Sequence, residues 1–269
     1  MTHLVSVHDR QALADFLGKD SRRHIYALGD LDPFFWPSTQ WYGLKEDRDG
    51  PLLAVALLYL APNVPTLLAL DQEPQHLRDL LEKLGPLLPR RFYAHIEHGL
   101  ETIFQAQGWR MDPNGPHHRM ALVGQPITKG IDTSRVQTLT EADLPELLEF
   151  YAHSYPGNWF DPRMLQTGRY VGIRGEDGLR AVAGIHVHSL SYAVAALGNI
   201  TTAPEHRRKG LGKATVAALV DTLHQEVDEV ALNVHADNHG AIALYRALGF
   251  EIHCSFLEAM FSIPPNPNP

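Results

Sequence analysis

The sequence predicts a mixed α/β protein built from two domains, each with helices that cover a twisted sheet. The chain has 269 residues, which is more than the roughly 100–200 of an ordinary domain. Its hydrophobic fraction is 44% and its charged fraction is 20%, the balance of a globular protein with a sizeable core. In the second half, short β-branched or alternating runs are interleaved with segments of helical periodicity, which favours a sheet flanked by helices.

A turn-rich segment divides the chain. Residues 124–134 (GQPITKGIDTS) mix Gly, Pro, Ser and Thr without apolar periodicity, as linkers do. We therefore predict a first domain at 1–126, a linker at 127–134 and a second domain at 135–262. The tail at 263–269 is rich in proline and has no core-forming pattern, so we expect it to be disordered.

The second domain is predicted to run strand, helix, three strands, helix, strand, helix, strand. Thr140 is placed to cap the first helix, which is expected to end near Ala152, and Gly249 is placed to cap the last one. The strands are expected at residues 136–139, 170–174, 179–188, 193–202, 227–234 and 250–261, and the two later helices at 210–224 and 241–248.

The first half contains a weaker copy of this pattern. Residues 104–109 (FQAQGW) match residues 245–250 (YRALGF), which favours a duplicated domain, with a chance match of one short segment as the alternative. The apolar run at 52–62 is about half of the ~20 residues that a membrane helix needs, so we predict a buried strand there. At the offset that relates residues 104–109 to residues 245–250, residues 66–71 correspond to residues 207–212.

Charge and composition exclude several classes of function. The net charge of −8 disfavours general attraction to nucleic acid or to an anionic membrane. Cys254 is the single cysteine, so no intrachain disulfide and no cysteine-based zinc site can form. Because the N-terminus has no secretion signal, we expect a cytoplasmic protein. None of the histidine pairs among the 16 histidines has an evident third ligand, so no metal site is predicted.

The strongest chemical signal is a basic, glycine-containing loop that joins a strand to a helix at residues 200–213 (ITTAPEHRRKGLGK). The N-terminus of a helix leaves backbone N–H groups unpaired and binds phosphate readily. Gly210 and Gly212 lack a Cβ, so an anion can approach the main chain closely. The loop therefore predicts a diphosphate site, although an ordinary basic helix cap would have a similar sequence. Positive charge is concentrated here in four side chains, Arg207, Arg208, Lys209 and Lys213.

Residues 135–261 resemble the acetyl-CoA-binding core of the GNAT superfamily of N-acetyltransferases. The resemblance lies in the R-x-x-G-x-G loop, in residues 233–238 and in residues 241–250 (AIALYRALGF). The resemblance implies that the strands at about 194–202 and 228–235 splay apart and hold pantetheine. It also implies which residues bind the cofactor: backbone near Ile200, Thr201 and Thr202, amides from Arg207 through Leu211 to Lys213, Asn238 on the pantetheine side, and Tyr245.

Tyr245 matches the general acid of that family. Acyl transfer from a thioester to an amine expels a thiolate, and a phenol with a pKa near 10 holds a proton at neutral pH and can donate it to sulfur. The alternative is that Tyr245 is simply a core aromatic of a helix.

The base that deprotonates the amine is less clear from the sequence. Residues 192–202 contain no Asp, Glu or His, which departs from the strand glutamate of the family, and Asn199 could at most orient a water. His186, His188 and Glu258 remain open as bases, with a structural role for each as the alternative.

The predicted function is an acyl-CoA-dependent N-acyltransferase that moves acetyl from acetyl-CoA to a primary amine of a small molecule or peptide. A non-catalytic CoA-binding sensor is the alternative. The first domain is interpreted as a degenerate GNAT-like copy that binds no cofactor, because residues 66–71 hold no glycine and Phe104 stands in the place of Tyr245. Four aromatic residues either line the acceptor pocket or form a satellite hydrophobic cluster: Tyr155, Trp159, Phe160 and Tyr170.

Overall fold

The computed structural model describes residues 2–47, 49–61 and 64–263, and it confirms a mixed α/β fold. The chain forms two compact units. Unit 1 comprises residues 1–119, 235–237 and 253–269, and unit 2 comprises residues 120–234 and 238–252. The predicted tail lies outside the described residues except for Ile263, whose N–H donates to the carbonyl of Arg90.

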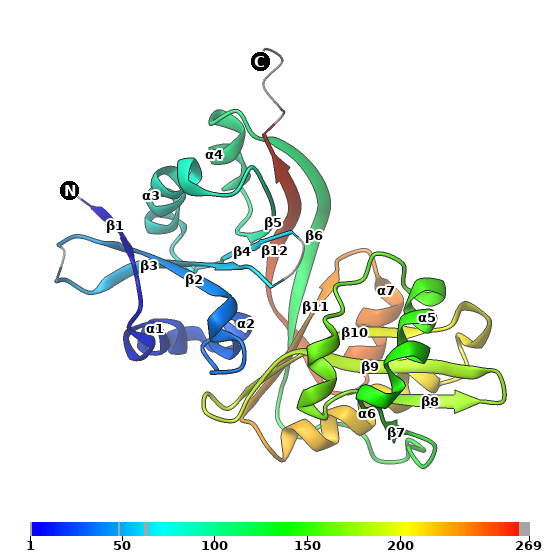
Figure 1. Cartoon of the computed structure of the whole chain (residues 1–269). Helices are drawn as coiled ribbons and strands as arrows, with labels where there is room; N and C mark the ends of the chain where they lie inside the picture. The colour runs from blue at the N-terminus through cyan, green and yellow to red at the C-terminus, as the bar shows by residue number, and fades with distance from the viewer. Residues whose placement is uncertain (1, 48, 62–63, 264–269) are drawn as a thin grey trace. The chain divides into compact units, whose positions relative to one another are not determined.

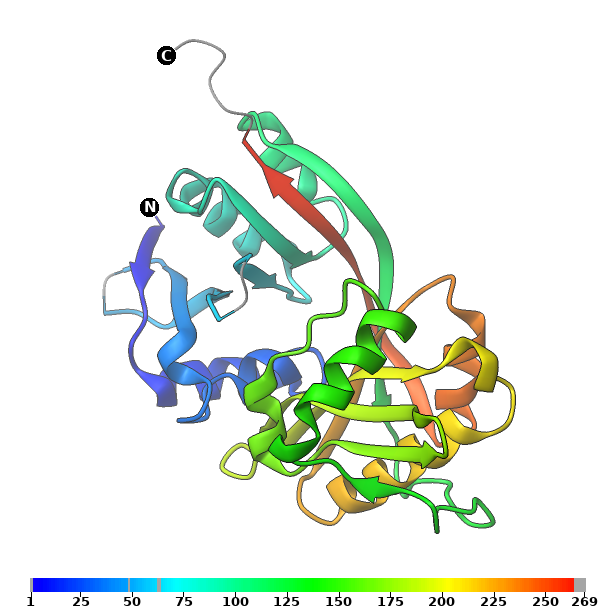
Figure 2. The same cartoon turned by 45° about the vertical axis from the view of Figure 1, so that its right-hand side comes forward.

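The two units are not the contiguous domains that the sequence suggested. Strand β6 (Arg110–Leu122) and strand β12 (Phe250–Ser262) each divide their residues between both units. In unit 1 the strand order is β1-β2-β3-β4-β5-β12-β6, so a strand from the end of the chain lies between β5 and β6 (Figures 1 and 2). Hydrophobic periodicity marks a strand but does not tell which sheet the strand joins. The predicted linker at 127–134 lies inside unit 2 and does not mark a boundary between the units.

Unit 1 is built around a largely antiparallel sheet with one parallel pair, β4 and β5. The predicted buried strand is confirmed as β3. Helix α3 packs against β2 and β3 with four fully buried leucines at helical spacing, Leu77, Leu80, Leu81 and Leu84. The elements are β1 (His3–Ser6), α1 (Arg10–Leu17), α2 (Ile25–Gly29), β2 (Thr39–Lys45), β3 (Leu52–Tyr59), β4 (Thr66–Ala69), α3 (Pro74–Leu84), β5 (Arg91–Ile96) and α4 (Glu101–Ala106).

Unit 2 contains the helices and strands predicted for the second domain except the last strand, β12, most of which belongs to unit 1. Its strand order is β6-β11-β10-β9-β8-β7, helix α6 packs along β8, β9 and β10, and α5 contacts β9. Thr140 forms the predicted cap, a reciprocal pair with Asp143 ahead of α5. The elements are β7 (Gln137–Thr138), α5 (Leu144–Ser154), β8 (Val171–Gly175), β9 (Gly178–Ser189), β10 (Val194–Thr202), α6 (Leu211–His224), β11 (Glu229–His235) and α7 (His239–Arg246).

The local structure supports the duplication. The series β4-α3-β5-α4-β6 has the same order as β10-α6-β11-α7-β12, and each series contains one parallel pair. Gly108 and Gly249, which the matched segments share, both have positive φ, at 86° and 97°. These glycines make the left-handed turn from helix to strand in both halves.

The offset that placed the counterpart of the basic loop at 66–71 is wrong. Residues 66–69 form β4, and the connection from β4 to α3 is the short segment 70–73. The connection from β10 to α6 is longer, at residues 203–210. The two halves therefore differ by a deletion at this point, which a constant offset cannot represent. The short connection still carries two acids and no glycine, so the expectation that it binds no diphosphate is unchanged.

Strand β12 brings a carboxylate into the interior of unit 1. Glu258 is 7% exposed and accepts a hydrogen bond of 2.5 Å from the hydroxyl of Tyr93. The Nε2 atoms of His95 and His117 each lie 3.5 Å from one of its oxygens. Burial alone would raise the pKa of Glu258, but the two imidazoles and the hydrogen bonds from Tyr93 and Asn114 leave that pKa lowered.

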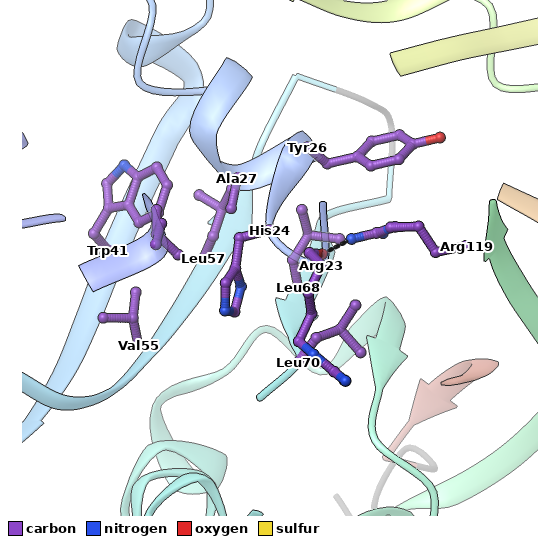
Figure 3. Close-up of a pocket in the computed structure, with 11 residues that line it drawn as sticks. Arg23, His24, Tyr26, Ala27, Trp41, Val55, Leu57, Leu68, Leu70 and Arg119 are labelled. Carbon is purple, nitrogen blue, oxygen red and sulfur yellow. Dashed lines mark hydrogen bonds between the residues drawn. The ribbon is translucent and has the colours of Figure 1, made fainter. Parts of the chain in front are cut away.

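A small cavity lies beside the buried polar groups of unit 1. Figure 3 shows His24 and Arg119 on the wall of this cavity, whose volume of about 20 Å³ gives room for about one water molecule. The guanidinium of Arg119 donates to the carbonyl of Arg23, which the dashed line marks, and it lies 4.7 Å from the ring centroid of Tyr26. Burial lowers the pKa of His24 to about 4, and burial likewise lowers the pKa of His95 to about 4.

We expect the free energy of unfolding to fall as the pH falls from about 6.5 to 4. Below its ordinary pKa of 6.5, His24 of the unfolded chain takes up a proton that the folded protein excludes. The free energy of unfolding therefore falls by about 2 kcal/mol per buried histidine between pH 7 and 5. Urea unfolding followed by circular dichroism at several pH values measures this slope. The variant His24→Phe removes one titrating group, so its fall in unfolding free energy between pH 7 and 5 should be about 2 kcal/mol smaller than that of the parent. An equal slope in the variant and the parent would contradict the assignment.

Candidate functional site

The parallel pair β10 and β11 is joined over only part of its length. Val194 to Leu197 pairs with Glu229 to Leu232, and within the described residues the register ends there. Strand β10 continues to Thr202, and β11 continues beyond Leu232. Beyond these pairs, the described residues of the two strands share no further register pair, which is the pattern expected if the strands separate toward their carboxyl ends.

A bulge lies just beyond the end of this pairing. On the other edge of β10, Gly198 pairs with Gly184 and Thr201 pairs with Val182, so β10 contains one extra residue between these points. Asn199 is 5% exposed and has a φ of 52°. From the sequence, Asn199 was expected at most to orient a water, and the bulge was not predicted. Its signal was the Gly-Asn pair inside an otherwise regular strand.

The loop before α6 has the backbone geometry of an anion site. Arg208 and Gly210 both have positive φ, at 61° and 80°, and Gly210 is the N-cap of α6. The first backbone hydrogen bond of the helix runs from Ala214 N–H to the carbonyl of Gly210, at 3.0 Å. Within the described part of the chain, no acceptor is found for the N–H groups of residues 211–213. These groups are the unpaired donors of a helix start.

The two glycines of the loop have different roles. A Cβ added to Gly210 would meet no atom within 4 Å, so the space in front of this residue is open. A Cβ on Gly212 would lie 2.9 Å from the Oγ1 of Thr202, so Gly212 allows the first turn of α6 to approach β10. A side chain at 212 would push the helix away from the strand, whereas a side chain at 210 would enter the open space.

The four cations of the loop fall into two pairs. The Nε of Arg207 donates to the carbonyl of Thr202 at 3.2 Å, and the Nζ of Lys209 donates to the carbonyl of Glu205 at 3.1 Å, so these two side chains bind the loop itself. For Arg208 and Lys213 the described residues offer no ion pair and no hydrogen bond. These two cations are therefore available to an anion bound at the helix start.

Helix α7 lies against the first turn of α6. The side chain of Leu244 lies 3.9 Å from the position of a Cβ on Gly212. Asn238 is exposed and caps α7, because its Oδ1 accepts from the N–H of Ala241 at 3.2 Å. Tyr245 is 7% exposed, and its ring centroid lies 6.1 Å from that of Phe250. The ring of Tyr245 is thus packed in the core, and the role of Tyr245 as an acid stays a prediction.

The three candidate bases have different surroundings. A Cβ on Gly198 would lie 2.0 Å from the ring of His186, so this ring packs directly on β10 beside the bulge. The Nε2 of His188 lies 3.2 Å from Glu226, which also pairs with Arg169. The partners that hold Glu258 all belong to unit 1.

Two of the four aromatic residues singled out in the sequence, Phe160 and Tyr170, lie in a hydrophobic cluster, and the acceptor-pocket role of Tyr155 and Trp159 stays a prediction. Phe160 packs on Tyr151 and Tyr170 at centroid distances of 5.3 and 5.4 Å, as a hydrophobic cluster would. Tyr155 and Trp159 are 43% and 40% exposed. Across the described ranges, no group of three or more His, Cys, Asp or Glu side chains is placed to hold a metal, and no helix has the length and apolar character to cross a bilayer.

The chain is similar to a known family, to named enzymes and to solved structures. The model of the acetyltransferase (GNAT) family matches residues 136–250. The mycothiol acetyltransferase of Kocuria rhizophila is 43% identical over 101 residues, which is 35% of this chain and 32% of that enzyme, so the match spans about a third of the relative. The ribosomal protein bS18-alanine N-acetyltransferase of Escherichia coli K12 is 34% identical over 119 residues, which is 43% of this chain and 79% of that enzyme.

Among solved structures, the tandem GNAT protein from the clavulanic acid biosynthesis pathway has a TM-score of 0.60 with 16% identity, and the match covers 99% of this chain and 100% of that protein. At this identity the match shows the fold, including the tandem arrangement.

Proposed function

The chain belongs to the GNAT acetyltransferase family, and from this premise we propose that unit 2 binds acetyl-CoA at the start of α6 and transfers its acetyl group to a primary amine. One observation carries the proposal. The unpaired N–H groups of residues 211–213 lie beside open space at Gly210, at the end of a strand whose pairing with its parallel neighbour has stopped.

The residues at this helix start fit a diphosphate. Three N–H groups, two left-handed residues (Arg208 and Gly210) and the cations Arg208 and Lys213, which have no partner among the described residues, supply donors and positive charge in one place. The open space at Gly210 gives an anion direct access to the backbone. Arg207 and Lys209 hold the loop in shape through its own carbonyls.

The strand ends and α7 supply the rest of the binding surface. Residues 198–202 of β10 have backbone groups that β11 does not use, and these can bond the amides of pantetheine. Asn238 uses its Oδ1 to cap α7, which leaves its Nδ2 to donate to the cofactor. When bound, acetyl-CoA supplies an acetyl thioester, whose carbon–sulfur bond breaks as the amine nitrogen bonds to the acetyl carbon.

Two side chains handle the protons of this reaction. Tyr245 donates its phenolic proton to the leaving sulfur. An ammonium has no lone pair, so the amine must first lose a proton, and among the three candidate bases we assign this role to the imidazole of His186. His186 packs on Gly198 beside the bulge of β10, whereas His188 is paired with Glu226 and Glu258 is held in unit 1.

The names of two relatives indicate which classes of acceptor to test. One relative is named for mycothiol and another for an alanine of a ribosomal protein, so both small amines and peptide N-termini are reasonable substrates to test.

Calorimetry and thiol release test the proposal together. We expect the full chain to bind CoA with measurable heat, and we expect acetyl-CoA to release free thiol in the presence of at least one small amine or alanine-initiated peptide. Absence of heat with CoA would contradict the cofactor site. CoA binding without amine-dependent thiol release would contradict the transferase activity.

A further inference from the structure

We propose that Asn199 is a positioning residue for acetyl transfer, because its buried tether to two tyrosines fixes the bulge of β10 and thereby directs backbone N–H groups toward the acyl group. This inference rests on the proposed function of unit 2. From the sequence alone, Asn199 was expected at most to orient a water; in the structure it is bonded to Tyr151 and Tyr170.

The bulge frees backbone groups at a defined place. Within the described residues, Asn199 and Ile200 have no register partner on β9 or on β11. Bulges re-aim the groups that they remove from a sheet ladder, and they are frequent next to active sites. N–H groups held toward a thioester oxygen stabilise the negative charge that develops there, which is usually a large part of catalysis. Their effect depends on a fixed direction, so something must hold the bulge.

Asn199 is held at both its side chain and its carbonyl. Its Nδ2 donates to the hydroxyl of Tyr170 at 3.0 Å, and that hydroxyl donates onward to the carbonyl of Ile185 at 3.0 Å. The hydroxyl of Tyr151 donates to the carbonyl of Asn199 at 2.8 Å. The tether thus joins β10 to α5, to β9 and to the residue that precedes β8.

The conformation of Asn199 needs such a tether. A φ of 52° is disfavoured for residues with a Cβ, although Asn tolerates it better than most, and such residues persist where the surroundings determine them. Tyr151 and Tyr170 are 2% and 0% exposed. Burial raises the pKa of both phenols, so both hydroxyls stay protonated and keep donating at any pH at which the protein works.

The fold leaves room for this arrangement through a pair of glycines. A Cβ on Gly184 would lie 2.2 Å from the ring of Tyr170, so no other residue at 184 would let the ring sit there. Gly184 is the register partner of Gly198, on which His186 packs. The tether and the assigned base therefore lie around the same cross-strand pair.

Two variants test the tether without removing the fold. Asn199→Gly keeps the left-handed backbone available and removes the side chain, and Tyr170→Phe keeps the ring against Gly184 and removes the hydroxyl. For both we expect kcat for acetyl transfer to fall about 10- to 100-fold, the loss expected when an oxyanion donor is misplaced. The dissociation constant of CoA should change less than about threefold, because the diphosphate loop is untouched.

A spectroscopic readout separates positioning from stability. We expect the carbonyl stretch of bound acetyl-CoA labelled with carbon-13 at the acetyl carbonyl to lie below its value in water in the parent, and to move back toward that value in both variants. In the ligand-free protein, amide hydrogen exchange at residues 200 and 201 should become faster in both variants. Leu223→Val, in the last turn of α6, is the control: it lowers the melting temperature and should change neither kcat nor the carbonyl stretch.

Two results would overturn the inference: an unchanged carbonyl stretch in both variants, or a fall in kcat no larger than that of Leu223→Val. If the parent does not bind CoA, the proposed function fails, and the exchange measurement then decides by itself whether the tether fixes the bulge.

Discussion

Replacing Tyr245 with phenylalanine is expected to lower kcat by about 10²- to 10⁴-fold, the range typical of the loss of a general acid. The ring is buried and packs near Phe250, and phenylalanine keeps this packing, so the variant should fold like the parent. The change removes only the proton donor for the leaving sulfur. Steady-state thiol release gives kcat, and calorimetry with CoA should give a dissociation constant equal to that of the parent.

The pH profile adds a second readout to this test. If Tyr245 acts as the acid, the basic limb of the kcat profile in the parent reports its ionisation and should be absent in the variant. Tyr192→Phe is a matched control, because Tyr192 is a half-buried residue of the turn between β9 and β10. We expect that control to keep the kcat of the parent. Turnover of Tyr245→Phe within twofold of the parent would remove Tyr245 from the mechanism and leave it as a core aromatic.

The sequence predicted the parts of unit 2 that depend on local chemistry. Strands and helices from residue 135 onward follow apolar spacing, and Thr140 and Gly249 mark helix ends through side-chain capping and a positive φ. The start of α6 was predictable for the same reason, because Gly210 and Gly212 matter through the absence of a Cβ, which a sequence displays directly. Local rules were sufficient wherever a residue acts on its immediate neighbours.

The parts that were missed depend on partners distant in the chain. Strand β12 reads as a strand in the sequence, but its pairing with β5 joins residues more than 160 positions apart, such as Ala259 and Ala94. The tether of Asn199 comes from Tyr151 and Tyr170, which no spacing rule connects to it. The loop cations could be listed but not sorted, since the carbonyls that bind Arg207 become visible only in the folded loop.

The second large effect is expected for Gly210→Glu, which should weaken CoA binding by at least about a hundredfold, equivalent to about 2.8 kcal/mol. Gly210 has a φ of 80°, and nothing lies within 4 Å of the position of its Cβ. The new side chain would extend into the space that we assign to the diphosphate, and its carboxylate would repel phosphate oxygens in front of the helix start. Calorimetry with CoA, with a thermal shift as a second measurement, tests this expectation.

Two control variants separate charge and binding from backbone strain. Gly210→Gln has the same size and the same strain without the charge, so its loss of affinity should be smaller, and the difference between the two variants gives the electrostatic part. Gly130→Glu matches the strain elsewhere in unit 2, because Gly130 has a φ of 85° and also has nothing within 4 Å of a Cβ. It should lower the melting temperature by a similar amount and leave CoA binding intact. If Gly210→Glu bound CoA as Gly130→Glu does, the anion would not lie at this helix start, and the site proposed for unit 2 would have to be abandoned.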